Sequence, residues 1–390
     1  MVFGLRDLCA GAEPTLRGAP VHKKGVNKYA GYVAGGKVGW YSKNSFPASI
    51  PSSLSKALVK AANNSLASST WMSYGSIHKH LKGCQDYTGK RLQFPFTHES
   101  VLTLLGYLFG QTTLKSATIN NLMSALRTAH ISKGYYLHVL RPDIVSSLLK
   151  GRANRDACLA RRKVERLPVT VDILNMLGLI LELNTQLSRP YKLLVWAVSV
   201  IAFWGSFRIG ELLSKRARTI DPETDLLKKD VMLVSRKVSG KNKEILQVSL
   251  KSPKEARGNS VPVVVEVFQT GDSLCPVKAY KDYSEAVGVK KLNSAAFRVP
   301  ICGEAYRHQR FNADLKMLLG PHIKYGRILG HSFRAGLASL MAKKGFSQDE
   351  IKGIGRWTSE AFMKYIKSGR LLRFRFSEKL VKAVREEMKG

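Results

Sequence analysis

Apolar residues recur at helical spacing through most of this chain, and this periodicity restricts the folds that are open to it. Between residues 48 and 155 they fall three and four positions apart, as along the buried face of a helix. The clearest stripes are Trp71, Tyr74, Ile77, Leu81 and Cys84; Val101, Leu104, Leu105 and Leu108; and Ile119, Leu122, Met123, Leu126 and His130. They predict a small helical bundle, with an N-cap at Thr70, a helix stop at Lys133 and Gly134, and outer helices from Ser55 and over 142–150. We expect His130 to be buried and hydrogen-bonded rather than to bind a ligand.

The pattern changes twice after this bundle. Residues 153–168 are rich in arginine, lack apolar periodicity and end in a proline, which predicts an interdomain linker. Helical patterns return over 171–183 and 191–204, three runs of alternating or β-branched residues follow at 231–234, 245–250 and 261–267, and helices resume after Pro276. The three runs predict a small antiparallel sheet, so the fold class is mostly α with a small antiparallel β-sheet (α+β). The expected organisation is a flexible basic N-terminal arm (1–47), a helical domain (48–152), the linker and a second domain (169–390). The arm either contacts nucleic acid or is a leader without a role.

A surplus of positive charge restricts the partners of the chain. Its 390 residues carry 63 Lys and Arg against 28 Asp and Glu, a formal net charge of +35. Such a surplus points to a polyanion, with nucleic acid ahead of a membrane surface. The longest apolar run, over 193–204, is too short to span a bilayer, and the N-terminus shows no signal-peptide pattern. The five cysteines never form a CxxC pair, so we expect no disulfide framework, no metal site and no secretion.

Four features of the second domain combine residue types that can handle a phosphodiester. Arg208 follows an apolar helix in SFRIGELL, and a lysine-rich turn, SLKSPKEARGNSVPV, joins two strands. His331 and Arg334 stand one helical turn apart in HSFRAGLASLMAKKG, and Trp357 precedes Tyr365 in GRWTSEAFMKYI. Two guanidinium groups and an N–H donor can stabilise the charge that develops on phosphate oxygens, and neighbouring cations favour the phenolate of a tyrosine nucleophile. A lysine on a mobile turn can protonate the departing oxygen.

Each feature alone has a plainer explanation. Trp357 and Tyr365 could be core residues, and Glu211 could be a solvated partner of Lys215 at i+4. In order and register, however, the features resemble the Arg–Lys–His-x-x-Arg–His/Trp–Tyr set of the tyrosine recombinase (phage integrase-like) family, over about residues 50–390. The segment HSFRAGLASLMAKKGFSQDEIKGIGRWTSEAFMKYI is most similar to recombinases of eukaryotic mobile elements of the Crypton and DIRS/Ngaro type.

This resemblance implies a helical SAM-like core-binding domain, a catalytic domain and a role for each residue of the set. Tyr365 would attack the scissile phosphate and form a 3′-phosphotyrosyl link, while Arg208 and Arg334 would clamp the phosphate oxygens. The remaining implied roles are proton transfer by His331, N–H donation and packing by Trp357, support of the site by Glu211, and protonation of the leaving group by Lys254. Lys251 is the rival of Lys254, and Tyr325 competes with Tyr365 only through its nearness to His331.

The implied function is that of a site-specific DNA recombinase or integrase, serving the integration or excision of a mobile element without a metal or other cofactor. Its partners would be double-stranded DNA and further copies of itself in a homotetramer, coupled by the amphipathic segment after Tyr365; that segment could instead pack on its own domain. The alternative functions are a type IB topoisomerase and a catalytically inactive DNA-binding protein of the same fold. The expected location is the nucleus in a eukaryotic host, and otherwise the cytoplasm or nucleoid.

Overall fold

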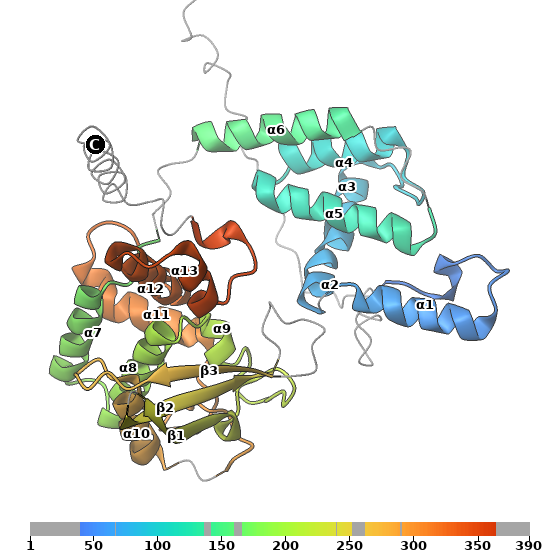
Figure 1. The fold of residues 1–390 in the computed structure, drawn as a ribbon. Coiled ribbons are helices and arrows are strands. Elements are labelled where there is room, and N and C mark those ends of the chain that lie inside the picture. The colour runs from blue at the N-terminus through green and yellow to red at the C-terminus, as the bar shows by residue number, and fades with distance from the viewer. Residues whose placement is uncertain are drawn as a thin grey trace, which may run out of the picture. The chain divides into compact units, whose positions relative to one another are not determined.

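The computed structural model describes residues 40–66, 68–135, 142–159, 166–238, 240–251, 262–288 and 291–363. The chain divides into two compact units, residues 1–162 and 163–390. Helices dominate both units, and the three strands of the described residues all belong to the second (Figure 1). This confirms the predicted fold class, mostly α with a small antiparallel sheet.

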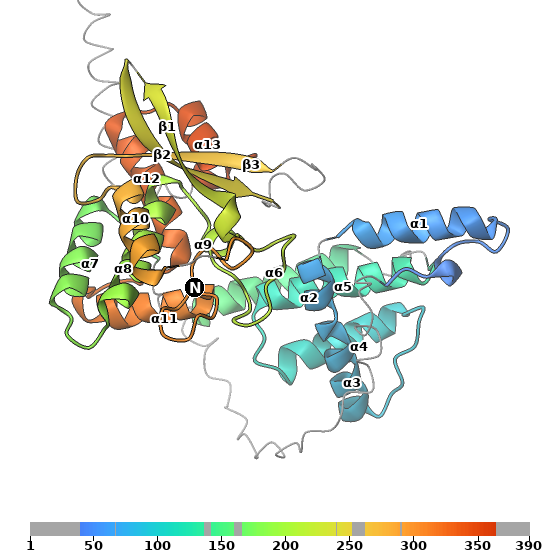
Figure 2. The same ribbon diagram turned by 90° about the horizontal axis from the view of Figure 1, so that it is seen from below.

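The helices of the first unit are drawn in Figure 2, and buried apolar side chains form its core. In its described residues they are α1 (Ser52–Asn64), α2 (Ser68–Tyr74), α3 (Ser76–Thr88), α4 (His98–Gly110), α5 (Ser116–Ser132) and α6 (Pro142–Leu159), with a 3₁₀ turn η2 (Lys43–Ser45) before them. Every residue of the three predicted stripes is buried except Tyr74. His130 is buried as predicted: its Nε2 accepts the amide N–H of Phe96 at 2.9 Å, and its Nδ1 lies 2.9 Å from the carbonyl oxygen of Leu126. Burial lowers the pKa of His130, so the ring is held neutral as a structural group.

Two helices of the first unit differ from their predicted bounds. The helix expected to start after Thr70 begins at Ser68, so Thr70 is not its N-cap, and it is two helices, α2 and α3, with Gly75 between them. Helix α6 continues to Leu159, past its predicted end at Lys150. Polar contacts hold its last turns: Arg152 donates to the carbonyl oxygens of Phe109 and Leu114 at 2.8 and 3.0 Å. Apolar periodicity cannot reveal a helix end that is held in this way.

Residues just before α1, which the sequence assigned to a flexible arm, pack against the first unit. The Trp40 ring lies 5.5 Å from the Trp71 ring, and the Tyr41 amide donates to Asn63 Oδ1 at 2.9 Å. Residues 1–39 of the expected arm lie outside the described part of the chain.

The second unit contains helices around a central one and a sheet at one side (Figure 1). Its described elements are α7 (Val171–Leu183), α8 (Arg189–Trp204), α9 (Ile209–Leu212), η3 (Lys228–Asp230), β1 (Val231–Val238), β2 (Lys241–Leu250), β3 (Val263–Phe268), α10 (Pro276–Val287), α11 (His308–Leu319), η5 (Gly320–His322), α12 (Gly330–Lys344), α13 (Gln348–Gly355) and η6 (Glu360–Phe362). The strands pair antiparallel in the order β1-β2-β3, with Val234 opposite Ile245 and Ile245 opposite Phe268. This is the sheet that the sequence predicted.

Helix α8 is the centre of the second unit. From Leu194 to Phe203 every residue except Trp196 is buried, because α7, α10 and α12 all pack against it. A helix that is covered on all sides is apolar on all sides, which accounts for the long apolar run of the sequence. Among the described residues, no helix combines the length and the apolar character needed to cross a bilayer.

Candidate functional site

The turn after α8 holds Arg208 in a fixed place. Phe207 is fully buried, and its ring fills the space where a side chain at Gly205 would lie, 2.1 Å from an ideal Cβ. Ser206 adopts the left-handed region with φ of 49°, which reverses the chain. Arg208 follows as the N-cap residue of α9. The backbone of Arg208 is therefore set by the packing of Phe207 in the core.

Glu211 binds Arg208 twice. Its Oε2 accepts the backbone N–H of Arg208 at 2.9 Å, and its Oε1 accepts from Arg208 Nη1 at 3.0 Å. The Glu211 side chain is only 9% exposed, while that of Arg208 remains 22% exposed. The alternative interpretation of Glu211 as a solvated partner of Lys215 is wrong. Helix α9 ends at Leu212, before Lys215, and the Glu211 carboxylate faces arginines instead.

Arg334 reaches the same carboxylate from α12. Its Nη1 lies 4.0 Å from Glu211 Oε1 and donates to the Ser206 carbonyl oxygen at 3.3 Å. Its Nη2 donates to the carbonyl oxygens of Gly355 and Arg356, the latter at 3.4 Å. The Arg334 side chain is 3% exposed, so solvent reaches Arg208 far more easily than Arg334. The two predicted clamp arginines thus lie together, one at the surface and one behind it.

Two glycines allow α12 to come this close. An ideal Cβ on Gly330 would lie 2.5 Å from Ile209 of α9, and one on Gly336 would lie 1.9 Å from the carbonyl oxygen of Val169. Both are distances that packed side chains do not reach. Gly330, directly before the segment HSFRAG, and Gly336, at its end, are therefore required for the approach of Arg334 to Arg208.

Arg356 is part of this cluster, although the sequence gave no reason to select it. Its Nη2 donates to Glu211 Oε2 at 2.9 Å and to the Ser206 carbonyl oxygen at 3.3 Å, while its Nη1 donates to the Gly205 carbonyl oxygen at 3.0 Å. Its guanidinium also lies over the Phe207 ring at 5.0 Å. Its position directly before Trp357 in GRW is the one sequence signal that could have pointed to it.

His331 stands beside the cluster at the start of α12. Partial desolvation lowers its pKa below the ordinary 6.5, and the charges of Arg166, Arg208 and Arg334 lower it further, against an opposing effect of Glu211. A lowered pKa keeps the imidazole neutral at pH 7, which leaves one ring nitrogen free to accept a proton. The sequence placed Arg166 in a linker. Its backbone forms an isolated parallel β-bridge with Arg327, a few residues before His331.

Trp357 packs on the buried clamp arginine. The Arg334 guanidinium lies 4.5 Å from the centre of the indole ring, and Phe362 of η6 lies 5.7 Å from it on ring centres. A cation over an aromatic face is attracted electrostatically, and here the contact fixes the position of the guanidinium. Trp357 is therefore packed between Arg334 and Phe362.

Four other residues were considered for the site from the sequence, and the structure describes two of them, Lys251 and Tyr325. Lys254 and Tyr365 lie outside the described residues. Lys251, the rival of Lys254, is held by an ion pair to Asp230 Oδ2 at 2.7 Å and a hydrogen bond to the Pro222 carbonyl oxygen at 2.9 Å. Tyr325 lies in the loop before α12 with 85% of its surface exposed.

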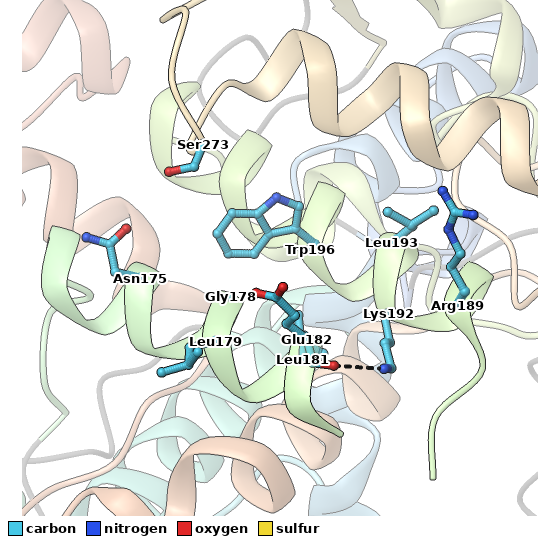
Figure 3. A pocket seen from close by; sticks show the side chains of 10 residues that line it. All are labelled: Asn175, Gly178, Leu179, Leu181, Glu182, Arg189, Lys192, Leu193, Trp196 and Ser273. Carbon is cyan, nitrogen blue, oxygen red and sulfur yellow. Dashed lines mark hydrogen bonds between the residues drawn. The ribbon is translucent and has the colours of Figure 1, made fainter. Parts of the chain in front are cut away.

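A cavity of about 450 Å³ elsewhere in the unit shares no residue with the arginine cluster (Figure 3). It lies between α7 and α8, with Trp196 and Leu193 on one side and Gly178 and Leu179 on the other. Lys192 closes one end by donating to the carbonyl oxygen of Glu182 at 3.2 Å. The described part of the chain holds no group of three or more His, Cys, Asp or Glu side chains arranged to bind a metal.

Comparison with known proteins assigns the fold. No family model matches the sequence, and no curated protein matches it. Among solved structures, the XerH site-specific recombinase bound to palindromic difH substrate matches with a TM-score of 0.50 and 13% identity, over 85% of this chain and 85% of that one. The Tn1549 transposon integrase in complex with transposon right end DNA matches with a TM-score of 0.50 and 11% identity, over 84% of this chain and 98% of that one. The chain therefore has the fold of tyrosine recombinases.

Proposed function

We propose that this chain is a tyrosine recombinase, which cleaves and rejoins DNA strands through a 3′-phosphotyrosyl intermediate. The observation that carries the proposal is the convergence of Arg208 and Arg334 on Glu211, with Oε1 of that carboxylate 3.0 and 4.0 Å from their Nη1 atoms. In the proposal, the more exposed Arg208 contacts the phosphate first, and the buried Arg334 beside it adds a second positive charge. The net charge of +35 supplies the attraction to DNA.

In the proposed reaction, the Tyr365 oxygen forms a bond to the scissile phosphorus while the bond from phosphorus to the 5′-oxygen breaks. Neutral His331 takes the phenolic proton, and Lys254 gives a proton to the departing oxygen. Arg208 and Arg334 stabilise the charge that develops on the two non-bridging oxygens. The reverse reaction with another 5′-hydroxyl rejoins the strand, so the bond energy is conserved and no cofactor is consumed.

The link between Tyr365 and the cluster is the length of the chain. Phe362, which is fully buried, packs on Trp357, and Trp357 packs on Arg334. Three residues span at most about 11 Å, so the length of the chain after Phe362 is compatible with an approach of Tyr365 to this guanidinium. Tyr325 has no such connection to the buried groups, since it lies exposed in a loop.

The finer parts of the proposal draw on the two matched structures. Both hold DNA in their complexes, and one is a transposon integrase, which favours double-stranded DNA as the partner and the movement of a genetic element as the purpose. We propose residues 48–152 as a core-binding domain, a homotetramer coupled by the segment after Tyr365, and origin in a Crypton or DIRS/Ngaro-type element. In a eukaryotic host such an enzyme would work in the nucleus.

The test of the proposal is covalent capture on DNA. A nicked substrate, from which the short cleaved fragment diffuses away, should trap the protein as an adduct that denaturing electrophoresis resolves. Tyr365→Phe should abolish the adduct, while the matched variant Tyr325→Phe should retain it. An adduct that persists in Tyr365→Phe would exclude this nucleophile. DNA binding without any adduct would favour the inactive alternative, and relaxation of an arbitrary plasmid by the monomer would favour the topoisomerase.

The choice of leaving-group acid has its own test. A sulfur in place of the bridging 5′-oxygen leaves as a thiolate. It needs little help from an acid, since the pKa of a thiol, about 8.5, lies far below that of an alcohol. Lys254→Ala should therefore cleave the oxygen substrate slowly and the sulfur substrate at the wild-type rate. Lys251→Ala should show no such selective recovery, because its ammonium is engaged by Asp230.

A further inference from the structure

We propose that Arg356 is a positioning residue that aims the Arg208 guanidinium at the phosphate, an inference that rests on the proposed function. The side chain of Arg356 spans two separate parts of the site. It binds the turn before Arg208 through the carbonyl oxygens of Gly205 and Ser206, at 3.0 and 3.3 Å, and the Glu211 carboxylate at 2.9 Å.

One oxygen atom makes the connection to Arg208. Oε2 of Glu211 accepts both from Arg356 Nη2 and from the backbone N–H of Arg208, each at 2.9 Å. The other oxygen, Oε1, holds the Arg208 guanidinium at 3.0 Å. Because Arg356 fixes the rotation of this carboxylate, it fixes the direction in which Arg208 points.

The backbone of Arg356 also holds the second clamp arginine. Its carbonyl oxygen accepts from Arg334 Nη2 at 3.4 Å. The same residue thus reaches Arg334 through its main chain and Arg208 through its side chain and Glu211. It joins the two clamp arginines in one rigid arrangement.

The backbone conformation of Arg356 supports a role for its side chain. Arg356 ends α13 in the left-handed region with φ of 51°, which glycine adopts most readily. A strained residue persists where its surroundings over-determine it, and strain of this kind gathers at functional sites. The acceptors that surround the guanidinium, and the Phe207 ring beneath it at 5.0 Å, provide that over-determination.

Only a planar fork can make these contacts. The two terminal nitrogens of Arg356 reach three acceptors in different directions while the plane of the group stacks on a ring. A lysine ammonium is a compact point charge that cannot reproduce such an arrangement. Arg356→Gly removes the fork and relieves the backbone, whereas Arg356→Lys keeps the charge. The two variants therefore separate geometry from charge and from backbone strain.

The first measurement is single-turnover cleavage of the nicked substrate at saturating DNA. Both Arg356 variants should cleave about 10²-fold more slowly than wild type, as a displaced catalytic group does, with DNA affinity within about threefold. The matched control is Arg218→Ala, which removes an arginine from a different carboxylate, Glu304, at 2.7 Å; it should cleave as wild type does. Wild-type cleavage by Arg356→Lys would overturn the inference, because charge alone would then suffice.

The second measurement needs no DNA and follows hydrogen exchange of individual amides. The Arg208 amide is protected by the Glu211 carboxylate, so in Arg356→Gly its exchange should rise at least about tenfold. Amides at the centre of α8, such as that of Val198, should keep their protection. An unchanged exchange rate of the Arg208 amide would overturn the inference. An equal rise of the exchange rates in α8 would also overturn it, because it would show a general loss of stability.

The two measurements separate this inference from the proposed function. A wild-type protein that forms no Tyr365-dependent adduct would refute the recombinase proposal. The exchange of the Arg208 amide would still decide whether Arg356 positions this residue.

Discussion

Glu211→Gln should destabilise the second unit far more than the loss of an ordinary ion pair. The substitution keeps the shape of the side chain but removes the one negative charge that faces three guanidinium groups, at 3.0 Å from Arg208, 2.9 Å from Arg356 and 4.0 Å from Arg334. Hydrogen bonds to a charged group are worth about 1.5–3 kcal/mol each, roughly twice neutral ones, so weakening the two bonds from the guanidinium groups of Arg208 and Arg356 costs about 1.5–3 kcal/mol. The weakened bond from the Arg208 backbone N–H, and the lost attraction to the buried Arg334, bring the expected loss to about 3–4 kcal/mol.

Differential scanning calorimetry of the full chain measures this loss. For a unit of this size, 1 kcal/mol shifts Tm by about 2–4 °C, so the transition of the second unit should fall by about 6–16 °C. Glu304→Gln is the matched control: its carboxylate pairs with Arg218, whose side chain is 88% exposed, so Tm should shift by less than about 2 °C. Equal shifts for the two variants would refute the view of Glu211 as the buried centre of the arginine cluster.

Two further predictions follow from the same geometry. Gly336→Ala should destabilise the second unit by about 1–3 kcal/mol, because the new Cβ would lie 1.9 Å from the Val169 carbonyl oxygen. Unfolding in urea measures this loss. An unchanged midpoint would contradict the close approach of α12 to Val169. His331 should titrate below its ordinary 6.5 in an NMR titration, and Glu211→Gln should lower its pKa further, because Glu211 is the group that raises it. Since the unfolded chain then binds the proton more tightly, stability should fall as pH drops below about 6.5 towards the folded pKa. This loss should be smaller in His331→Gln, and the part that remains comes from other histidines of lowered pKa such as His130. A pKa above 6.5 would contradict the placement of His331 beside the arginines.

Periodicity predicted the elements of the fold because burial on one face leaves a regular trace. The stripe over 101–108 became the buried face of α4, and the alternating runs became the three strands of one sheet. It failed where polar contacts or single residues decide the structure. Gly75 divides one expected helix into two, and the hydrogen bonds of Arg152 carry α6 beyond its predicted end.

The site likewise contains residues that the sequence pattern reveals and residues that it does not. Arg208 and Arg334 stand in motifs that mark them, and the structure brings them together. Arg356 could not be found in this way, because its role depends on a left-handed turn and on acceptors supplied by residues 205 and 206, far from it in the sequence. Glu211 could be selected only through the resemblance, since local spacing pointed to Lys215 rather than to the arginines that it binds.

The charge of the cluster fits the proposed transition state better than the proposed substrate. The three guanidinium groups that face Glu211, together with its carboxylate, carry two net positive charges. A phosphodiester carries one negative charge, and attack by a phenolate adds a second to its oxygens. A site with two net positive charges therefore stabilises the transition state more than the bound DNA, which is the condition for acceleration rather than mere binding. On this reasoning Glu211 does more than hold Arg208, because its carboxylate also lowers the positive charge of the cluster.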